Sequence, residues 1–346
     1  MARQSRLFVE EENKMKIGVI GSGAWGLALS TVLVDNGHKV KVYARNPLEL
    51  NSINKNHTQN KAFEDIKLSE KIIAVSSIKE TIFDAEAILF AVPSAYAYDV
   101  ICEVNEILDH KVYVFNATKG LDLTHNSTMQ KLIRDNLNPQ NVLGISSILG
   151  PGFAKEVILK NITAVCAASY DLNYAKFTQQ VFSNSYFRVY AMSDVIGAEI
   201  GTSLKNAMAI GSGVLRGLGY GENSKSALVT RGLAEITRFG VAFGAKPETF
   251  LGLTGVGDLI LTCNSKESRN FRAGYQIGQD DTAEIFLKNN KMTVEGIGAI
   301  RAVYEIAKEN KIDMPIIEAL YDVVYLGAKP SDVVDKLMNR PLRREK

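Results

Sequence analysis

The stretch that decides the fold is KIGVIGSGAWGLALSTVLVDNG, residues 16–37. Its first five residues form a short apolar run that is typical of a buried strand. The run leads directly into Gly21-Ser22-Gly23-Ala24-Trp25-Gly26, which is followed by a helix-forming segment and then by a second strand candidate at 39–43. A G-x-G-x-x-G motif alone is weak evidence, but between a strand and a helix it predicts a dinucleotide-binding turn.

Each glycine of this turn has its own expected role. Gly21 permits the tight turn, Gly23 lets the backbone approach a pyrophosphate, and Gly26 allows the helix to pack closely on the strand. The first amides of the helix would then point at the phosphates. The alternative is a glycine turn that binds no ligand.

Arg45 bears on the choice of cofactor. A site selective for NAD usually carries an acidic residue at the end of the second strand, where it bonds the ribose 2′-hydroxyl. This chain has Ala44-Arg45-Asn46 there. An arginine cannot accept that bond, but it can pair with a 2′-phosphate. We therefore favour NADP(H), with NAD(H) as the alternative cofactor and a solvent-facing arginine as the alternative role.

The rest of the chain changes character near residue 193. Before that point, short apolar runs alternate with helix-length segments, as in a parallel sheet covered on both faces. After it, apolar residues recur at helical spacing. We expect an α/β part with a Rossmann-type, doubly wound, mainly parallel sheet, followed by an all-α part. The remaining strand candidates are 72–75, 87–92, 111–116, 142–149, 162–168 and 186–190.

These patterns divide the chain into four expected parts. We expect residues 1–14, which are mostly polar and charged, to form a flexible extension. They lack the run of about 7–15 apolar residues that a secretory signal needs. Residues 15–193 form the dinucleotide-binding domain, and 194–340 form an all-helical substrate and dimerisation domain. Residues 341–346 form a basic tail. No stretch reaches the roughly 18 apolar residues of a spanning helix, so we expect no integral membrane contact.

Composition excludes several classes of function. The 346 residues include 40 Lys+Arg and 38 Asp+Glu, a net charge of +2 that gives no reason to expect a nucleic acid partner. The three cysteines and four histidines lie far apart or without metal-ligand spacing, so we expect no metal site. Scattered cysteines favour reduced thiols in the cytoplasm.

Three further segments suggest chemistry. Lys119 follows a strand at the sheet edge where ligands of such folds bind, although a lysine before glycine is also a common helix-capping residue. Lys205 lies in an apolar helical segment, where a buried lysine needs a partner or a lowered pKa, unless it snorkels to solvent. Asp258 ends a glycine-rich turn, and 268–270 (Ser-Arg-Asn) offers donors for a phosphate or carboxylate, or simply a polar helix cap.

Seven motifs follow one another along the chain: GSGAWG at 21–26, ATKGL at 117–121, GPGFAKE at 150–156, SLKNAMAIGSG at 203–213, ENSKSALVTRGLAE at 222–235, LTGVGDLILTC at 253–263 and SRN at 268–270. With these motifs in order, the chain resembles the bacterial NAD(P)-dependent glycerol-3-phosphate dehydrogenases from about residue 16 to about residue 340. The resemblance implies an enzyme that interconverts sn-glycerol 3-phosphate and dihydroxyacetone phosphate and supplies glycerophospholipid synthesis. It also implies a cytoplasmic homodimer.

The resemblance also implies roles for single residues. Lys205 matches the proton acceptor, and Lys119 and Asp258 complete the catalytic set. The cofactor-binding positions are Gly21, Gly23, Ala24, Trp25, Gly26, Arg45, Lys119, Ala154, Arg269, Thr293 and Glu295. The substrate-binding positions are Lys119, Gly150, Gly152, Lys205, Asp258, Ser268, Arg269 and Asn270.

The chain departs from the family pattern at two of these positions. Gly152 stands where the family commonly has serine or threonine, so a hydroxyl contact is lost and only the backbone can serve. Thr293 stands where valine is more usual.

Two rival functions are weighed against this one. A β-hydroxyacid dehydrogenase relative would act on a carboxylate, but it would not be expected to carry LTGVGDLILTC together with SRN. A redox sensor that binds NADP(H) without turnover would need neither the buried lysine nor the phosphate-binding residues.

Overall fold

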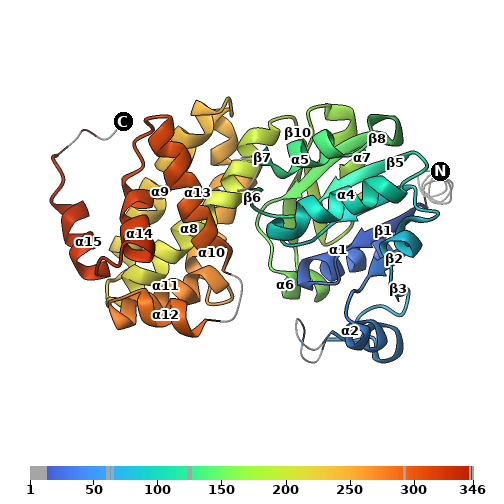
Figure 1. Ribbon diagram of the computed structural model, residues 1–346, viewed down its shortest axis with the longest axis horizontal. Coiled ribbons are helices and arrows are strands. Elements are labelled where there is room, and N and C mark those ends of the chain that lie inside the picture. The colour runs from blue at the N-terminus through green and yellow to red at the C-terminus, as the bar shows by residue number, and fades with distance from the viewer. Residues whose placement is uncertain are drawn as a thin grey trace, which may run out of the picture. The chain divides into compact units, whose positions relative to one another are not determined.

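The computed structural model describes residues 14–59, 63, 66–122, 127–290, 294–342 and 344 (Figure 1). Apart from Lys14, the predicted extension lies outside the described residues. The chain divides into two units. The first comprises Met1–Thr118, Met129–Ile148 and Gly152–Ser193, and the second comprises Lys119–Thr128, Leu149–Pro151 and Asp194–Lys346. The second unit therefore takes two short segments from within the region that sequence patterning assigns to cofactor binding.

The first unit is built on an eight-stranded sheet of order β10-β9-β8-β5-β4-β1-β2-β3. The registered pairs are parallel, which confirms the predicted mainly parallel sheet. Each predicted strand run is present in this sheet. The strands are β1 (Lys16–Ile20), β2 (Lys39–Tyr43), β3 (Ile72–Val75), β4 (Ala87–Phe90), β5 (Val112–Asn116), β8 (Val142–Leu149), β9 (Thr163–Ala168) and β10 (Phe187–Met192).

Both faces of this sheet are covered. In β4, Ala87 and Leu89 pack into one apolar cluster, whereas Ile88 and Phe90 pack into another. Alternate residues of a strand point to opposite faces, so the two clusters lie on the two sides, as a doubly wound sheet requires. The helices of this unit are α1 (Ala24–Asp35), α2 (Pro47–Asn51), α3 (Ile78–Ile82), α4 (Ala97–Ile107), α5 (Met129–Asn136), α6 (Ala154–Ile158) and α7 (Leu172–Phe182).

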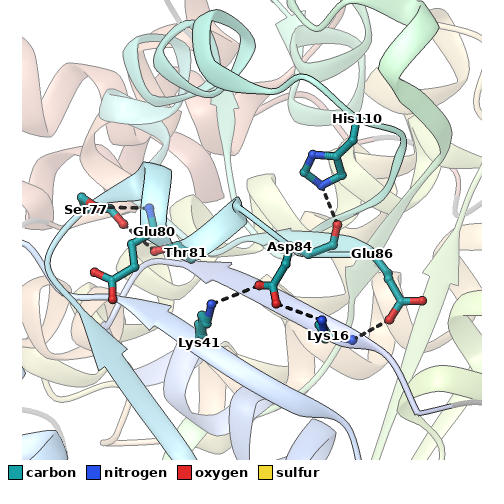
Figure 2. Close-up of polar contacts among 9 residues, drawn as sticks. Lys16, Lys41, Ser77, Glu80, Thr81, Asp84, Glu86 and His110 are labelled. Carbon is teal, nitrogen blue, oxygen red and sulfur yellow. Dashed lines mark hydrogen bonds and ion pairs between the residues drawn. The ribbon is translucent and has the colours of Figure 1, made fainter.

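A polar cluster ties the amino end of β1 to the loop before β4 (Figure 2). The Asp84 carboxylate pairs with Lys16 Nζ at 2.9 Å and with Lys41 Nζ at 3.0 Å. The backbone N–H of Lys16 donates to Glu86 Oε2 at 2.9 Å. Half-exposed ion pairs of this kind add little stability. The cluster lies at the amino end of β1, and the glycine loop follows the opposite end of that strand.

The second unit is mainly helical, as predicted, and is arranged around α8 (Val195–Gly217). Every residue of α8 from Gly197 to Val214 is buried, and the helix packs against α9, α10, α11 and α13 (Figure 1). A short antiparallel ribbon of β6 (Leu121–Asp122) and β7 (Ser127–Thr128) also contacts α8. The other helices are α9 (Glu222–Ala242), α10 (Asp258–Asn264), α11 (Arg269–Asp280), α12 (Glu284–Asn289), α13 (Glu295–Glu309), α14 (Pro315–Tyr325) and α15 (Pro330–Met338).

Glycines allow the backbones of α8 and α11 to approach each other. A Cβ at Gly274 would collide with the carbonyl oxygen of Ile210, and one at Gly278 would collide with that of Val214. Only glycine permits such close helix contact, and α8 is therefore held tightly at its centre. Among the described residues, no helix combines the length and the apolar character that crossing a membrane requires.

Candidate active site

Of the three glycines in the loop of the first unit, only Gly23 has open space where a side chain would begin. Gly21 has φ of +130°, and a Cβ there would collide with the backbone of Ala91. A Cβ at Gly26 would collide with the Gly21 carbonyl oxygen. A Cβ at Gly23 would meet nothing within 4 Å. The loop thus packs closely through Gly21 and Gly26, and it leaves open space at the glycine predicted to face a pyrophosphate.

The first turn of α1 suits a phosphate. The helix begins at Ala24, and its N-cap Gly23 supplies no side-chain hydrogen bond to the first amides. Unpaired amides and the positive end of the helix dipole attract an anion. The residues present therefore fit a dinucleotide pyrophosphate. Arg45 is exposed and lies two residues past the end of β2, which is the strand paired with β1.

Gly152 lies against Trp25 within the same unit. An ideal Cβ at Gly152 would stand 3.0 Å from Trp25 Cη2 and 3.6 Å from Thr163 Cγ2. Trp25 and Ala154 both pack on the same apolar cluster. Glycine at position 152 therefore leaves space for the Trp25 indole, and a larger residue there would crowd the ring.

We expect Gly152→Ala to displace the indole and to weaken NADPH binding by about two- to fivefold, since a contact of 3.0 Å forces the ring to move. Trp25 is the single tryptophan of the chain, so its emission reports this contact. Titrating that emission with NADPH measures the dissociation constant. Gly221→Ala is the matched control, because a Cβ there meets nothing within 4 Å. Unchanged emission and affinity in Gly152→Ala would contradict the steric account.

In the second unit, Lys205 and Asp258 form a buried ion pair. Lys205 is 4% exposed and Asp258 is fully buried, and Lys205 Nζ is in direct contact with Asp258 Oδ1. Lys205 projects from the middle of α8, and Asp258 is the first residue of α10, just after the helical turn Leu253–Gly257. The lysine is therefore buried with a partner and does not snorkel.

Lys119 is electrostatically linked to this pair. The pKa of Lys119 is lowered to about 8, first by desolvation on burial and then by the nearby Lys205 cation, while Asp258 and Glu295 oppose the shift. A lysine with such a pKa carries both its charged and neutral forms near neutral pH. A perturbed titratable group beside a buried charge pair is typical of a functional site.

Hydrogen bonds connect Asn206, Asn270 and Glu295 next to the ion pair. Asn206 Nδ2 donates to Glu295 Oε2 at 3.1 Å, and Asn270 Nδ2 donates to Asn206 Oδ1 at 2.9 Å. The backbone N–H of Gly296 donates to Asn270 Oδ1 at 2.9 Å. Asn206 lies within the SLKNAMAIGSG motif, but nothing in the sequence gives it a role of its own except its position next to Lys205.

The Ser-Arg-Asn segment lies at the start of α11. The Ser268 hydroxyl caps this helix by accepting from the N–H of Phe271 at 3.2 Å, which is the helix-cap role considered above as an alternative. The Arg269 guanidinium is half exposed and lies 3.7 Å from Glu295 Oε1. Residues 269 and 270 thus bring a cation and an amide to a helix N-terminus, where anions bind favourably.

Gly150 lies in the 149–151 segment, which belongs to this unit and contacts the turn before Asp258. A Cβ at Gly257 would stand 3.8 Å from Pro151 Cγ, and Gly150 has φ of +138°. The unit therefore contains the predicted substrate-binding positions Lys119, Gly150, Lys205, Asp258, Ser268, Arg269 and Asn270, with Glu295 beside them. Gly152 belongs to the first unit, and Thr293 lies outside the described residues.

The described residues contain no group of three histidine, cysteine, aspartate or glutamate side chains that could hold a metal ion. Within that same part of the chain, Cys102, Cys166 and Cys263 are free thiols. Cys263 is buried near the ion pair, and burial raises the pKa of its thiol to about 12, which makes it a poor nucleophile.

Comparison with known proteins identifies the family. The models described as NAD-dependent glycerol-3-phosphate dehydrogenase N-terminus and C-terminus match residues 16–175 and 194–335. An NAD(P)+ glycerol-3-phosphate dehydrogenase of Streptococcus pneumoniae (strain Hungary19A-6) is 43% identical over 332 residues, which is 96% of this chain and 98% of that protein. A Streptococcus thermophilus enzyme of the same name is 44% identical over the same shares.

Solved structures agree with this result. The crystal structure of a Coxiella burnetii glycerol-3-phosphate dehydrogenase matches 94% of this chain and 99% of its own, with a TM-score of 0.88 and 31% identity. The structure of a Plasmodium falciparum glycerol-3-phosphate dehydrogenase matches 98% of this chain and 99% of its own, with a TM-score of 0.84 and 25% identity. On the strength of the domain matches and the full-length relatives, the chain belongs to the NAD-dependent glycerol-3-phosphate dehydrogenase family.

Proposed function

We propose that the chain interconverts sn-glycerol 3-phosphate and dihydroxyacetone phosphate with NADP(H) or NAD(H). The observation that carries this proposal is the buried Lys205–Asp258 pair, which shares one unit with Lys119 and with the anion-attracting start of α11. A reaction on a polyol phosphate needs a proton-transfer group at C2 and a phosphate site nearby, and these residues can supply both.

Lys205 is the proposed proton-transfer residue. In the reducing direction, hydride adds to C2 of the ketone, and the carbonyl oxygen takes a proton from the Lys205 ammonium to become the hydroxyl. In the oxidising direction, the Lys205 amine takes the C2 hydroxyl proton as hydride leaves. Hydride transfer itself is the chemistry that a bound nicotinamide supplies. Asp258 holds the lysine in place as its buried counter-ion.

Lys119 is the proposed neighbour of the reacting oxygen. Its lowered pKa of about 8 comes first from burial and then from the Lys205 cation. In its charged form, Lys119 would stabilise negative charge that develops on the substrate oxygen, which is the usual role of a fixed cation in such a site.

Arg269 and Asn270 are the proposed phosphate-binding residues. We expect Arg269→Ala to raise the Michaelis constant for dihydroxyacetone phosphate about 10- to 100-fold, because a charge-assisted hydrogen bond contributes roughly 1.5–3 kcal/mol. Steady-state kinetics at saturating NADPH measures this change. Arg272→Ala is the control, since Arg272 is exposed on the same helix. An unchanged Michaelis constant in Arg269→Ala would remove Arg269 from the phosphate site.

A direct assay tests the function as a whole. NADPH absorbance should fall when dihydroxyacetone phosphate is added to the purified protein, and it should not fall with a β-ketoacid that lacks a phosphate. No substrate-dependent oxidation would restore the two rival functions, the β-hydroxyacid dehydrogenase and the redox sensor. Oxidation with the ketoacid alone would favour the first of them.

We further propose that the protein is a homodimer in the cytoplasm, as the family resemblance implies, and that its product serves glycerophospholipid synthesis. Light scattering coupled to size-exclusion chromatography distinguishes a dimer from the monomer mass of 37.9 kDa.

A further inference from the structure

Glu49 reaches back from α2 to the glycine loop. The Ser22 hydroxyl, between Gly21 and Gly23, donates a hydrogen bond to Glu49 Oε2 at 3.1 Å. Ser22 is buried and Glu49 is half-buried. A carboxylate is thereby fixed beside the loop that is open for a pyrophosphate.

The register of the sheet shows where this carboxylate lies. β1 and β2 pair in parallel, with Ile20 opposite Tyr43, so the glycine loop and the segment after β2 meet at the same carboxyl edge. The Ser22–Glu49 hydrogen bond links these two strand ends. In dinucleotide-binding folds, this is where the adenosine ribose is held, and a residue after the second strand reads its 2′ position.

Two opposite charges therefore flank the same subsite. Arg45, exposed after β2, can pair with a 2′-phosphate. We propose that Glu49, held by Ser22, is a second cofactor-selectivity residue that opposes Arg45 and narrows the preference for NADP(H) over NAD(H). This inference rests on the proposed use of a nicotinamide dinucleotide by the same site.

The charge of Glu49 acts in one direction on the two cofactors. A 2′-phosphate carries close to two negative charges, so a nearby carboxylate repels NADP(H). NAD(H) has a 2′-hydroxyl at that position, which can donate a hydrogen bond to a carboxylate. Both effects favour NAD(H). Neutralising the carboxylate removes the repulsion of the 2′-phosphate and leaves only a weaker, uncharged acceptor for the 2′-hydroxyl.

Glu49→Gln tests the proposal with little change in shape. The amide oxygen can still accept from Ser22, so the loop contact is retained while the charge is lost. We expect the ratio of kcat/KM with NADPH to that with NADH to rise by about fivefold, and the rise to shrink at high salt. Glu103→Gln is the matched control, since Glu103 is exposed on α4. Ser22→Ala should shift the ratio in the same direction, because it frees the carboxylate to move away.

Binding measurements separate this inference from the proposed function. The dissociation constants of NADP+ and NAD+ can be read from the emission of Trp25 without any substrate. Glu49→Gln should tighten NADP+ binding relative to NAD+ binding whether or not dihydroxyacetone phosphate is the substrate. An unchanged ratio of the two constants would overturn the proposal. If the ratio stays unchanged because both affinities fall equally, Glu49 only supports the loop.

Discussion

Lys205→Ala should lower kcat for dihydroxyacetone phosphate reduction by about 10²- to 10⁴-fold, because a positioned acid–base group contributes that much to a proton-transfer step. NADPH binding should stay nearly intact, since Lys205 lies in the second unit and the glycine loop lies in the first. Steady-state kinetics gives kcat, and titration of the Trp25 emission gives the NADPH dissociation constant. Turnover within a few-fold of the parent would show that Lys205 does not transfer the proton.

A second variant removes an ambiguity in that test. Lys205→Ala also leaves the Asp258 carboxylate buried without a counter-ion, and the resulting instability could lower activity by itself. Lys205→Arg keeps a cation beside Asp258, but a guanidinium does not give up its proton in proteins. We expect Lys205→Arg to be folded and as inactive as Lys205→Ala. Lys336→Ala is the surface control, since Lys336 is exposed on α15.

The fold was predictable because its signals are local. The apolar runs of β1–β5 and β8–β10 and the glycine turn after β1 are each contiguous in sequence, and they specify the parallel sheet without reference to distant residues. The assignment of 119–128 and 149–151 to the second unit was not predictable. Those segments follow sheet strands, and their place depends on long-range packing against α8 and the turn before Asp258.

The candidate site was predictable only in part. Lys205 attracted attention because a charge in an apolar helix is conspicuous, but nothing in the sequence indicated which carboxylate would neutralise it. Asn206 was missed because its two partners are 89 and 64 residues away. Ser268 shows the opposite difficulty, since a serine before a helix suits both a cap and a ligand contact, and the structure assigns its hydroxyl to the cap.

Asp258→Asn should lower the free energy of unfolding by about 3–5 kcal/mol, since removing one member of a buried ion pair leaves the other charge buried and uncompensated. Asparagine keeps the shape of the side chain, so packing at the start of α10 is little changed. Calorimetry should show a melting temperature at least about 5 °C below that of the parent. Asp335→Asn, at an exposed position of α15, should melt with the parent.

The double variant Lys205→Met with Asp258→Leu distinguishes the cost of an unpaired charge from the cost of lost packing. Replacing a buried ion pair by apolar residues of similar size is often neutral or stabilising, so this protein should melt above Asp258→Asn although it has lost both groups of the pair. It should also be inactive, because no proton-transfer residue remains. If the double variant melted lower than Asp258→Asn, the ion pair itself would stabilise the helical unit. Lys205 would then have a role in folding as well as in catalysis.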